Sequence, residues 1–359
     1  MMGRTSATAP AKPLRGSGAA VSTVSAQQAA ATQSARRLLR LGLGALWLLG
    51  GLLQAQPGMF AMDMISNTMQ PSSASQPLWL SGLIRWSIRL VTPHLVPFNW
   101  AVTGLEIALG GLLLSGRVRL IRIALWLSCL WALTVWIFGE GLGQLLTGSA
   151  TLLTGAPGTM LLYAATAAVL LVPITHWRPR PEKLPPLPTL VLLVVLVLGA
   201  GLQLAPIFWT RLGLASPFGE GAMMPQPEVL RLALSAPIAL AFAAPAAFNA
   251  ALVLSMLGSA ALLAWFPAHP AAFWAVAIFL GLVWLLGQDG GMLLGGMATD
   301  PNSMPILALL LWSGYRSCLG GCTRIPPQAN TRHRLGWNPV RTYNQPAHVG
   351  NTSKGQTRG

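Results

Sequence analysis

The chain has 359 residues, of which 53% are hydrophobic and only 9% are charged, and its 23 Lys and Arg outnumber its 8 Asp and Glu. Soluble domains carry about 25% charged residues, so this composition excludes a soluble globular protein. The chain is also too apolar to be mainly disordered. Its 3 cysteines exclude a disulfide framework and any zinc module built on cysteines. The composition therefore predicts a polytopic membrane protein.

Eight apolar runs are candidates for helices that cross a bilayer. A membrane helix needs about 20 mostly apolar residues, and continuous rather than alternating apolar character favours helices over strands. The runs cover residues 38–56, 98–116, 123–142, 159–175, 188–208, 244–265, 271–288 and 303–319. We therefore expect an all-α integral membrane protein with eight transmembrane helices, of which the fourth and eighth are short.

The distribution of Lys and Arg predicts how the chain is oriented. If the N-terminus is cytoplasmic, 19 of the 23 basic residues fall in cytoplasmic segments, and the outer segments keep only Arg85, Arg89, Arg211 and Arg231. Basic residues are retained on the cytoplasmic side, so we expect both termini in the cytoplasm and the chain in a bacterial plasma (inner) membrane. The basic ends favour contact with anionic lipid over binding of nucleic acid.

The sequence repeats itself after about 149 residues. WIFGEGLGQLLTGSAT at 136–151 matches WLLGQDGGMLLGGMAT at 284–299. Shorter matches recur in the same order: Gln54 with Gln203, Gln76–Pro77 with Gln226–Pro227, and Phe98–Asn99 with Phe248–Asn249. An even number of spans in each copy makes the two copies enter the membrane in the same direction. This pattern predicts two parallel tandem repeats of four helices.

The repeat defines five expected parts of the chain. They are a disordered basic cytoplasmic tail (1–36), a first membrane repeat (37–175), a cytoplasmic linker (176–187), a second membrane repeat (188–319) and a second disordered basic tail (320–359). The first repeat contains a long outer segment in which Ser81, Arg85 and Arg89 are spaced four residues apart. This polar stripe among apolar residues predicts an amphipathic helix at the outer interface.

The second predicted span carries a motif with an asparagine at its start, followed by Glu106 and a Gly-Gly pair, in FNWAVTGLEIALGGLLLSGRVRLIR (98–122). This pattern resembles the DoxX-like superfamily of membrane proteins over residues 38–175, and the second copy resembles it through the duplication. The resemblance implies four-helix membrane units. It also implies a role as membrane subunit or accessory protein of a quinone-linked or thiol-linked redox system. Quinone is then the candidate cofactor, and the candidate partners are a membrane redox protein and a second copy of the chain.

Glu106 is the one charged residue deep inside a predicted span, because Arg40, Glu140 and Arg316 lie within four residues of the ends of theirs. A carboxylate there costs about 2.5–3.5 kcal/mol on insertion scales, so such residues face the bundle interior. One interpretation is a carboxyl that handles protons or contacts a ligand, which predicts a small-molecule or ion transporter. The other is a structural carboxyl that is hydrogen-bonded to a neighbouring helix. The second copy has Met256 at this position, so only the first copy carries the carboxyl.

Four further polar residues are candidates at the outer face. Glu140 and Asp289 lie in the Gly-rich turns after the third and seventh spans, and Asn99 and Asn249 open the second and sixth. Acids in such turns have the chemistry to bind a cation or proton at the mouth of a cavity. Alternatively, the glycines and their polar neighbours only form the turns and pack the helices.

Methionines form a cluster after the first span, at Met59, Met62, Met64 and Met69. Thioethers select Cu(I), so this cluster predicts an outer-surface copper site; methionine filling irregular apolar surface is the alternative. The sequence contains no recognisable nucleophile, metal triad or cofactor-binding fingerprint, so it predicts no catalytic residue and does not favour an enzyme.

Overall fold

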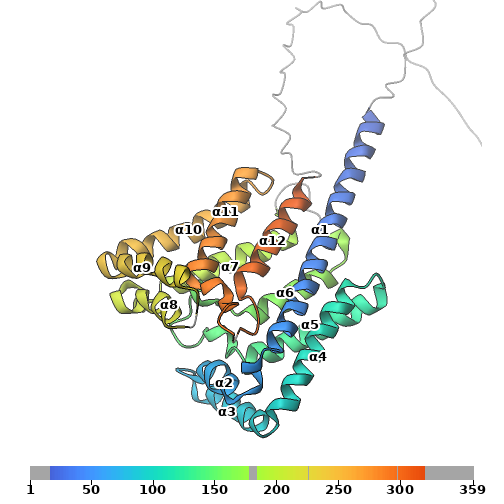
Figure 1. Cartoon of the computed structure of the whole chain (residues 1–359). Coiled ribbons are helices and arrows are strands. Elements are labelled where there is room, and N and C mark those ends of the chain that lie inside the picture. Colours follow the sequence, from blue (N-terminus) through green and yellow to red (C-terminus); the bar gives the residue numbers. More distant parts are fainter. Residues whose placement is uncertain (1–16, 178–183, 225, 297, 320–359) are drawn as a thin grey trace, which may run out of the picture. The chain divides into compact units, whose positions relative to one another are not determined.

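A computed structural model describes residues 17–177, 184–224, 226–296 and 298–319. All regular secondary structure within these ranges is helical (Figure 1). The helices are α1 (Ser17–Gln54), α2 (Met62–Met64), α3 (Leu78–Val91), α4 (Leu95–Leu114), α5 (Val118–Phe138), α6 (Thr159–Leu171), α7 (Leu187–Gln203), α8 (Arg211–Met223), α9 (Glu228–Ala243), α10 (Pro245–Trp265), α11 (Pro270–Leu282) and α12 (Ser303–Cys318). The expected all-helical fold is therefore confirmed for the described residues.

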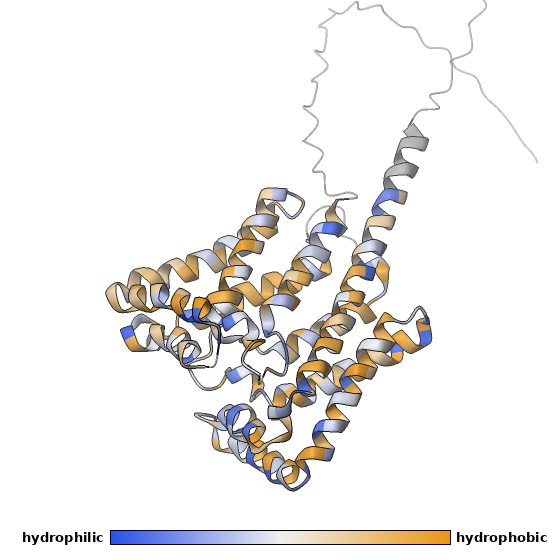
Figure 2. Ribbon diagram, viewed as in Figure 1, coloured by the Kyte–Doolittle hydropathy of each residue, from blue (hydrophilic) through white to orange (hydrophobic). Residues whose placement is uncertain are grey.

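Four helical segments within the described ranges are long and apolar enough to cross a membrane: Leu78–Leu114, Val118–Phe138, Pro245–Trp265 and Pro270–Gly287. Large apolar side chains cover their outward faces, so the ribbon stays hydrophobic away from the core (Figure 2). The remaining predicted runs also form helices, in α1, α6, α7 and α12. α6 and α7 are shorter than their predicted runs because Pro173 and Pro206 follow their ends.

Glycines bring α1 close to α4. A Cβ atom added at Gly110 would lie 2.7 Å from the carbonyl oxygen of Gly44, and one added at Gly51 would lie 3.0 Å from the backbone nitrogen of Ile107. Small residues permit such backbone approach between helices in lipid, where dispersion contacts replace the hydrophobic driving force. α1 also packs against α12, and α7 packs against α10 and α12. One buried apolar cluster runs through α1, α4, α5, α6, α7, α10, α11 and α12.

The expectation of a disordered tail over 1–36 was wrong for its second half, because α1 begins at Ser17. Thr32 and Ala35 are completely buried, and the Ser313 hydroxyl of α12 donates to the carbonyl oxygen of Ala35 at 3.1 Å. The segment is rich in alanine, which has the highest helix propensity, and Ala35 near its end contacts α12. The predicted tail at 1–16, the tail at 320–359 and linker residues 178–183 lie outside the described residues.

The predicted amphipathic segment is α3. Arg85 and Arg89 are exposed, as a helix at an interface requires, but Ser81 is buried. The Arg85 guanidinium donates to the Ser81 hydroxyl at 3.1 Å, so the stripe is tied together along the helix. α3 packs against α5, and Trp86, Ser87 and Val91 of α3 form one wall of the cavity between these helices.

We expect Gly110→Ala to lower the melting temperature of the purified protein in detergent. The added methyl group would meet backbone and side-chain atoms of α1 at 2.6–2.8 Å, and overpacking of this kind costs about 1–3 kcal/mol. Gly111→Ala is the matched control, because nothing lies within 4 Å of its Cβ position. An equal melting temperature for the two variants would contradict the close α1–α4 approach.

Candidate functional site

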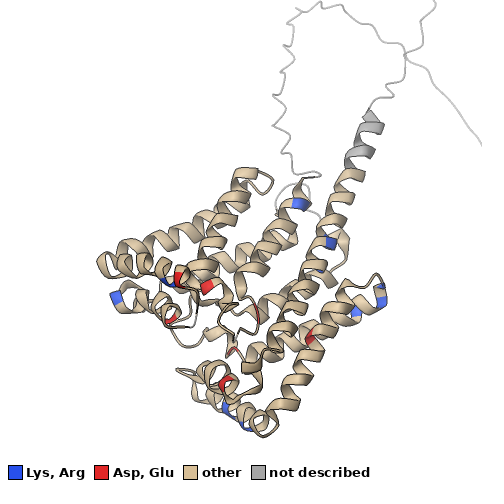
Figure 3. Cartoon of the chain, in the orientation of Figure 1, with Lys and Arg blue, Asp and Glu red and all other residues tan. Residues whose placement is uncertain are grey.

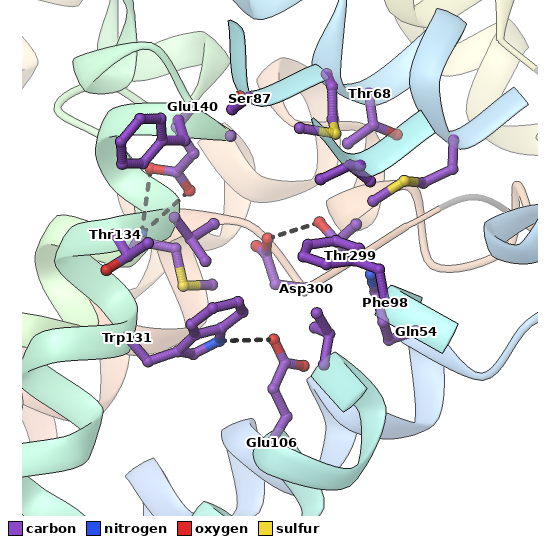
Figure 4. A pocket seen from close by; sticks show the side chains of 18 of the residues that line it. Gln54, Thr68, Ser87, Phe98, Glu106, Trp131, Thr134, Glu140, Thr299 and Asp300 are labelled. Atoms are coloured by element: carbon purple, nitrogen blue, oxygen red, sulfur yellow. Dashed lines mark hydrogen bonds between the residues drawn. The ribbon is translucent and has the colours of Figure 1, made fainter. Parts of the chain in front are cut away.

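A cavity of about 260 Å³ lies between α3, α4, α5 and the loop that precedes α12. Figure 4 shows that carboxyl side chains from three separate segments reach it: Glu106 from α4, Glu140 from the turn after α5, and Asp300 from the loop. Most of the remaining lining is apolar, with Trp86 and Trp131 among the aromatic residues. An apolar cavity with a few convergent polar groups is the usual form of a small-molecule site.

Glu106 has one free carboxylate oxygen in this cavity. Its side chain is only 6% exposed. The indole nitrogen of Trp131 donates to Oε1 at a long 3.4 Å, and Oε2 has no hydrogen-bond partner. A Cβ atom at Gly50 of α1 would lie 2.9 Å from Oε2, so a glycine leaves the space that this oxygen occupies. Buried polar atoms nearly always have partners, so the bare oxygen indicates a place for a proton or a ligand.

Asp300 is held by its own loop. The Thr299 hydroxyl donates to Oδ2 at 3.1 Å and the Asn302 backbone nitrogen donates to Oδ1 at 2.7 Å. Asn302, at φ 65°, caps α12 by accepting from the Ser303 nitrogen at 2.7 Å. Burial raises the pKa of the Asp300 carboxyl, and hydrogen bonds from Asn302, Thr299 and Thr159 oppose that rise only in part.

Glu140 caps the next helix. Its two carboxylate oxygens accept from the backbone nitrogen of Met160 at 3.1 and 3.3 Å, at the start of α6. A negative charge at a helix N-terminus is favourable. The Gly-rich turn that follows Glu140 needs its glycines, because Gly143 has φ 63° and a Cβ there would overlap the carbonyl oxygen of Pro157.

Gln288 has the same role in the second half of the chain. Its Oε1 accepts from the backbone nitrogen of Met304 at 3.3 Å, at the start of α12. The indole nitrogens of Trp136 and Trp284 likewise donate to Pro157 and Pro301 carbonyl oxygens at 2.8 and 2.9 Å. An amide therefore occupies one cap and a carboxylate the other.

A second cavity of about 520 Å³ adjoins the first. The two cavities share Thr68, Glu140, Thr299 and Asp300, so these residues separate them. Glycines of both Gly-rich turns and polar side chains line the second cavity. It forms a polar vestibule next to the apolar pocket, with two carboxyls at the boundary.

The three carboxyls have no cationic partner in the described part of the chain, where the ion pair present joins Arg231 to Glu228 on α9. Their summed charge favours a proton or a cationic ligand in the cavity. In the same part of the chain, no group of three or more His, Cys, Asp or Glu is arranged to hold a metal ion.

The other predicted polar residues lie elsewhere. Asp289 lines neither cavity; it lies against Gly221 of α8, and burial raises the pKa of its carboxyl to about 6. Asn99 and Asn249, placed at the outer face from the sequence, are completely buried. Their amide nitrogens donate to the carbonyl oxygens at the ends of α1 and α7, at 2.9 and 3.1 Å, because buried amides must find partners.

Only three of the four methionines in the predicted cluster lie together. Met59, Met64 and Met69 are buried together with Ile65 and Leu95 in a small apolar core. Met62 is 56% exposed and lies outside that core. The three buried residues have the gap-filling surroundings that methionine favours, and Met64 and Met69 also line the apolar pocket.

Sequence reasoning missed Asp300 and Trp131 as site residues. The signal for Asp300 was present in the match between 136–151 and 284–299: Asp300 follows Thr299 at the end of one stretch, whereas Leu152 follows Thr151 at the end of the other. No family model, no curated protein and no solved structure matches the chain. The site is therefore defined by its geometry alone.

We expect Glu140→Gln to fold with an unchanged melting temperature, because Gln288 shows that an amide caps the equivalent helix. Glu140→Ala should lose the cap, worth about 0.5–2 kcal/mol, and melt lower. Thermal unfolding of both variants separates the capping role of Glu140 from any role of its charge. A large loss of stability in Glu140→Gln would show that the charge itself is structural.

Thermal stability should fall as the pH rises above 3.8, the ordinary pKa of an aspartate carboxyl, toward the raised pKa of the buried Asp300. A carboxyl whose pKa is raised by folding binds its proton more tightly in the folded state, so its stabilisation is lost as the pH rises from its ordinary value of 3.8 through the raised one. Asp300→Asn should make this fall smaller. Asp63→Asn, at an exposed carboxyl on α2, is the control and should leave it unchanged. An equal pH dependence in both variants would contradict the burial of Asp300.

Proposed function

We propose that the chain is an integral membrane protein in which α1, α4, α5, α6, α7, α10, α11 and α12 all cross the inner membrane, with both termini cytoplasmic. The coincidence of every predicted apolar run with a helix supports eight spans. α6 has mostly buried residues, so neighbouring helices rather than lipid surround it and its short length is tolerated.

The arginines of α1 support this orientation. Arg40 donates to the Ser115 carbonyl oxygen after the end of α4 at 2.9 Å, and Arg36 donates to the Leu170 carbonyl oxygen in the last turn of α6 at 2.5 Å. The ends of these helices therefore lie beside the basic part of α1. Figure 3 shows arginines in blue at the turn between α4 and α5. The arginines of α3 come before the N-terminal end of α4, which is the other end of that helix. A basic face of this kind is retained in the cytoplasm.

The proposal includes two tandem four-helix repeats of the kind that the DoxX-like resemblance implies. Equivalent hydrogen bonds support it: the asparagines of α4 and α10 bind the ends of α1 and α7, and the Trp–Pro contacts and helix caps described above recur at matching positions. The recurrence covers side chains that general membrane composition does not require.

The protein acts, in this proposal, as a carrier for a small cation with an apolar body, bound in the Glu106 pocket and exchanged for a proton. The observation that carries this function is the bare Oε2 of Glu106, inside an apolar cavity with three acids and no described cationic partner. A carboxylate left unpaired there is costly, so the empty site holds a proton. A cationic ligand that displaces the proton keeps the charge of the site unchanged.

The lining of the cavity supports an organic cation over a hydrated metal ion. Trp131 and Trp86 offer aromatic faces, which attract ammonium groups by cation–π interaction. The apolar walls would strip water from the ligand without replacing it, which an ion such as Mg²⁺ resists. The polar vestibule beside Asp300 gives the charged group a path to the pocket.

A quinone-linked membrane subunit is the second candidate, and the aromatic lining favours it. Phe98, Phe138 and Trp86 line the cavity and suit a flat ring, and Glu106 in its neutral form would donate to a quinone oxygen. The two candidates differ in ligand charge. Loss of the Glu106 proton strengthens binding of a cation, but it removes the hydrogen-bond donor that a neutral quinone needs.

The test uses the full chain in detergent with radiolabelled benzyltrimethylammonium as probe. Its neutral isostere neopentylbenzene and a short-chain ubiquinone compete for the site. Cation binding should strengthen as the pH rises, because protons compete for the same carboxyls. Glu106→Gln should weaken it at least about tenfold, a loss of about 1.4 kcal/mol, and Asp300→Asn should weaken it as well.

Asp289→Asn, outside both cavities, is the matched control and should bind like the unaltered chain. Competition by neopentylbenzene as strong as by unlabelled cation, or full binding in Glu106→Gln, would contradict the carrier. Competition by quinone that is lost at high pH would favour the second candidate.

A further inference from the structure

Two glycines on the central helices face contrasting pairs of residues. A Cβ atom at Gly50 of α1 would lie 2.9 Å from Glu106 Oε2 and 3.5 Å from the carbonyl oxygen of Thr299, which precedes Asp300. A Cβ atom at Gly199 of α7 would lie 3.1 Å from Leu152 and 3.4 Å from the sulfur of Met256.

These positions correspond in the repeat. Gly50 and Gly199 are 149 residues apart, Glu106 and Met256 are 150 apart, and Leu152 and Asp300 are 148 apart. Each glycine thus faces one residue from its own half and one loop from the other half.

The loop that crosses over is fixed on both sides. In the first half, the loop carrying Leu152 reaches α7: the Thr151 hydroxyl donates to the Gln203 amide oxygen at 2.5 Å. The Gln288 amide in turn donates to the Leu152 carbonyl oxygen at 3.2 Å. In the second half, the loop carrying Asp300 reaches the pocket formed by α3, α4 and α5.

The two places differ in chemistry at both members of the pair. Glu106 and Asp300 are acids on one side, and Met256 and Leu152 are apolar on the other. The neighbouring Gln and Asn side chains differ too: they are hydrogen-bonded to each other on the apolar side and are not on the acidic side. Around Gly199, Gln203 donates to the Asn249 amide oxygen at 2.7 Å. Around Gly50, the corresponding oxygen of Asn99 has no partner, and Gln54 lines the pocket.

We infer that the chain has two equivalent ligand positions, one open and one sealed: Glu106 with Asp300 forms the open one, and Met256 with Leu152 fills its counterpart. Asp300 is then a specificity-determining residue that the second repeat supplies to the pocket of the first. This inference rests on the two-repeat carrier proposed above. One chain therefore holds one organic cation, and neither half forms the site alone.

The first test seals the open position with the residues of its counterpart, Glu106→Met with Asp300→Leu. The single Glu106→Met variant should melt higher than the unaltered chain at pH 7, because it removes a buried carboxyl whose Oε2 has no hydrogen-bond partner. The double variant also removes the acceptor of the Thr299 and Asn302 hydrogen bonds, so it is used for binding and not for stability. It should lose benzyltrimethylammonium binding. Met256→Ala with Leu152→Ala, which opens a void at the sealed position, is the control and should melt lower. A lower melting temperature for Glu106→Met would overturn the inference, because Glu106 would then be structural.

The second test opens the sealed position with Met256→Glu and Leu152→Asp. An apolar carbodiimide, which reacts with protonated carboxyls in apolar surroundings, should label Glu106 in the unaltered chain and position 256 as well in this variant. Cation binding should rise from one to two equivalents per chain. Where the double variant does not fold, the single Met256→Glu variant is labelled instead. A folded variant with no label at position 256 and unchanged stoichiometry would overturn the inference.

The tests separate this inference from the proposed function. Cation binding at Glu106 with no gain in the opened variant leaves the carrier intact and removes the second position. If Glu106→Met is more stable and position 256 is labelled, but no variant binds the cation, the two positions still correspond. The cation is then not the ligand.

Discussion

The structure depends on the accommodation of one carboxyl among apolar helices. Glu106 needs room beside α1, and Gly50 leaves it, because any side chain there would meet Oε2. The same close contact of α1 with α4, through Gly44 and Gly110, fixes where the carboxyl lies. Desolvation then makes its unpaired charge costly, so the group must hold a proton or meet a cation. The cavity, the loop that carries Asp300 and the aromatic lining all surround this carboxyl and set what it can bind.

The sequence predicted the fold to the extent that hydrophobic length decides it. All eight apolar runs form helices. α6 and α7 end earlier than predicted because Pro173 and Pro206 follow them. It also identified Glu106, because a lone acid in an apolar run is conspicuous. It missed the start of α1 at Ser17, in an alanine-rich segment of high helix propensity that contacts α12 at Ala35. It also missed Asp300, because local sequence does not reveal which loop meets which helix in space.

The two halves illustrate how the same local structure serves different ends. Glu140 and Gln288 cap their helices with side chains of the same shape, and only Glu140 is ionisable. Met256 and Leu152 pack tightly where Glu106 and Asp300 leave a cavity. Buried acids such as Glu106 and Asp300 cost stability, since a protein optimised only for packing would place apolar residues at both positions. The apolar half shows directly what such packing looks like within the same molecule.

The crossing of the loops has a consequence for ancestry. Under the tandem repeat and binding site proposed above, a solitary four-helix unit would lack the loop that closes its own site, so it would have to associate with an identical molecule. Two identical sites would then change together under every mutation. Joining both units in one polypeptide would remove that requirement, and one site could then become apolar packing while the other keeps its acids.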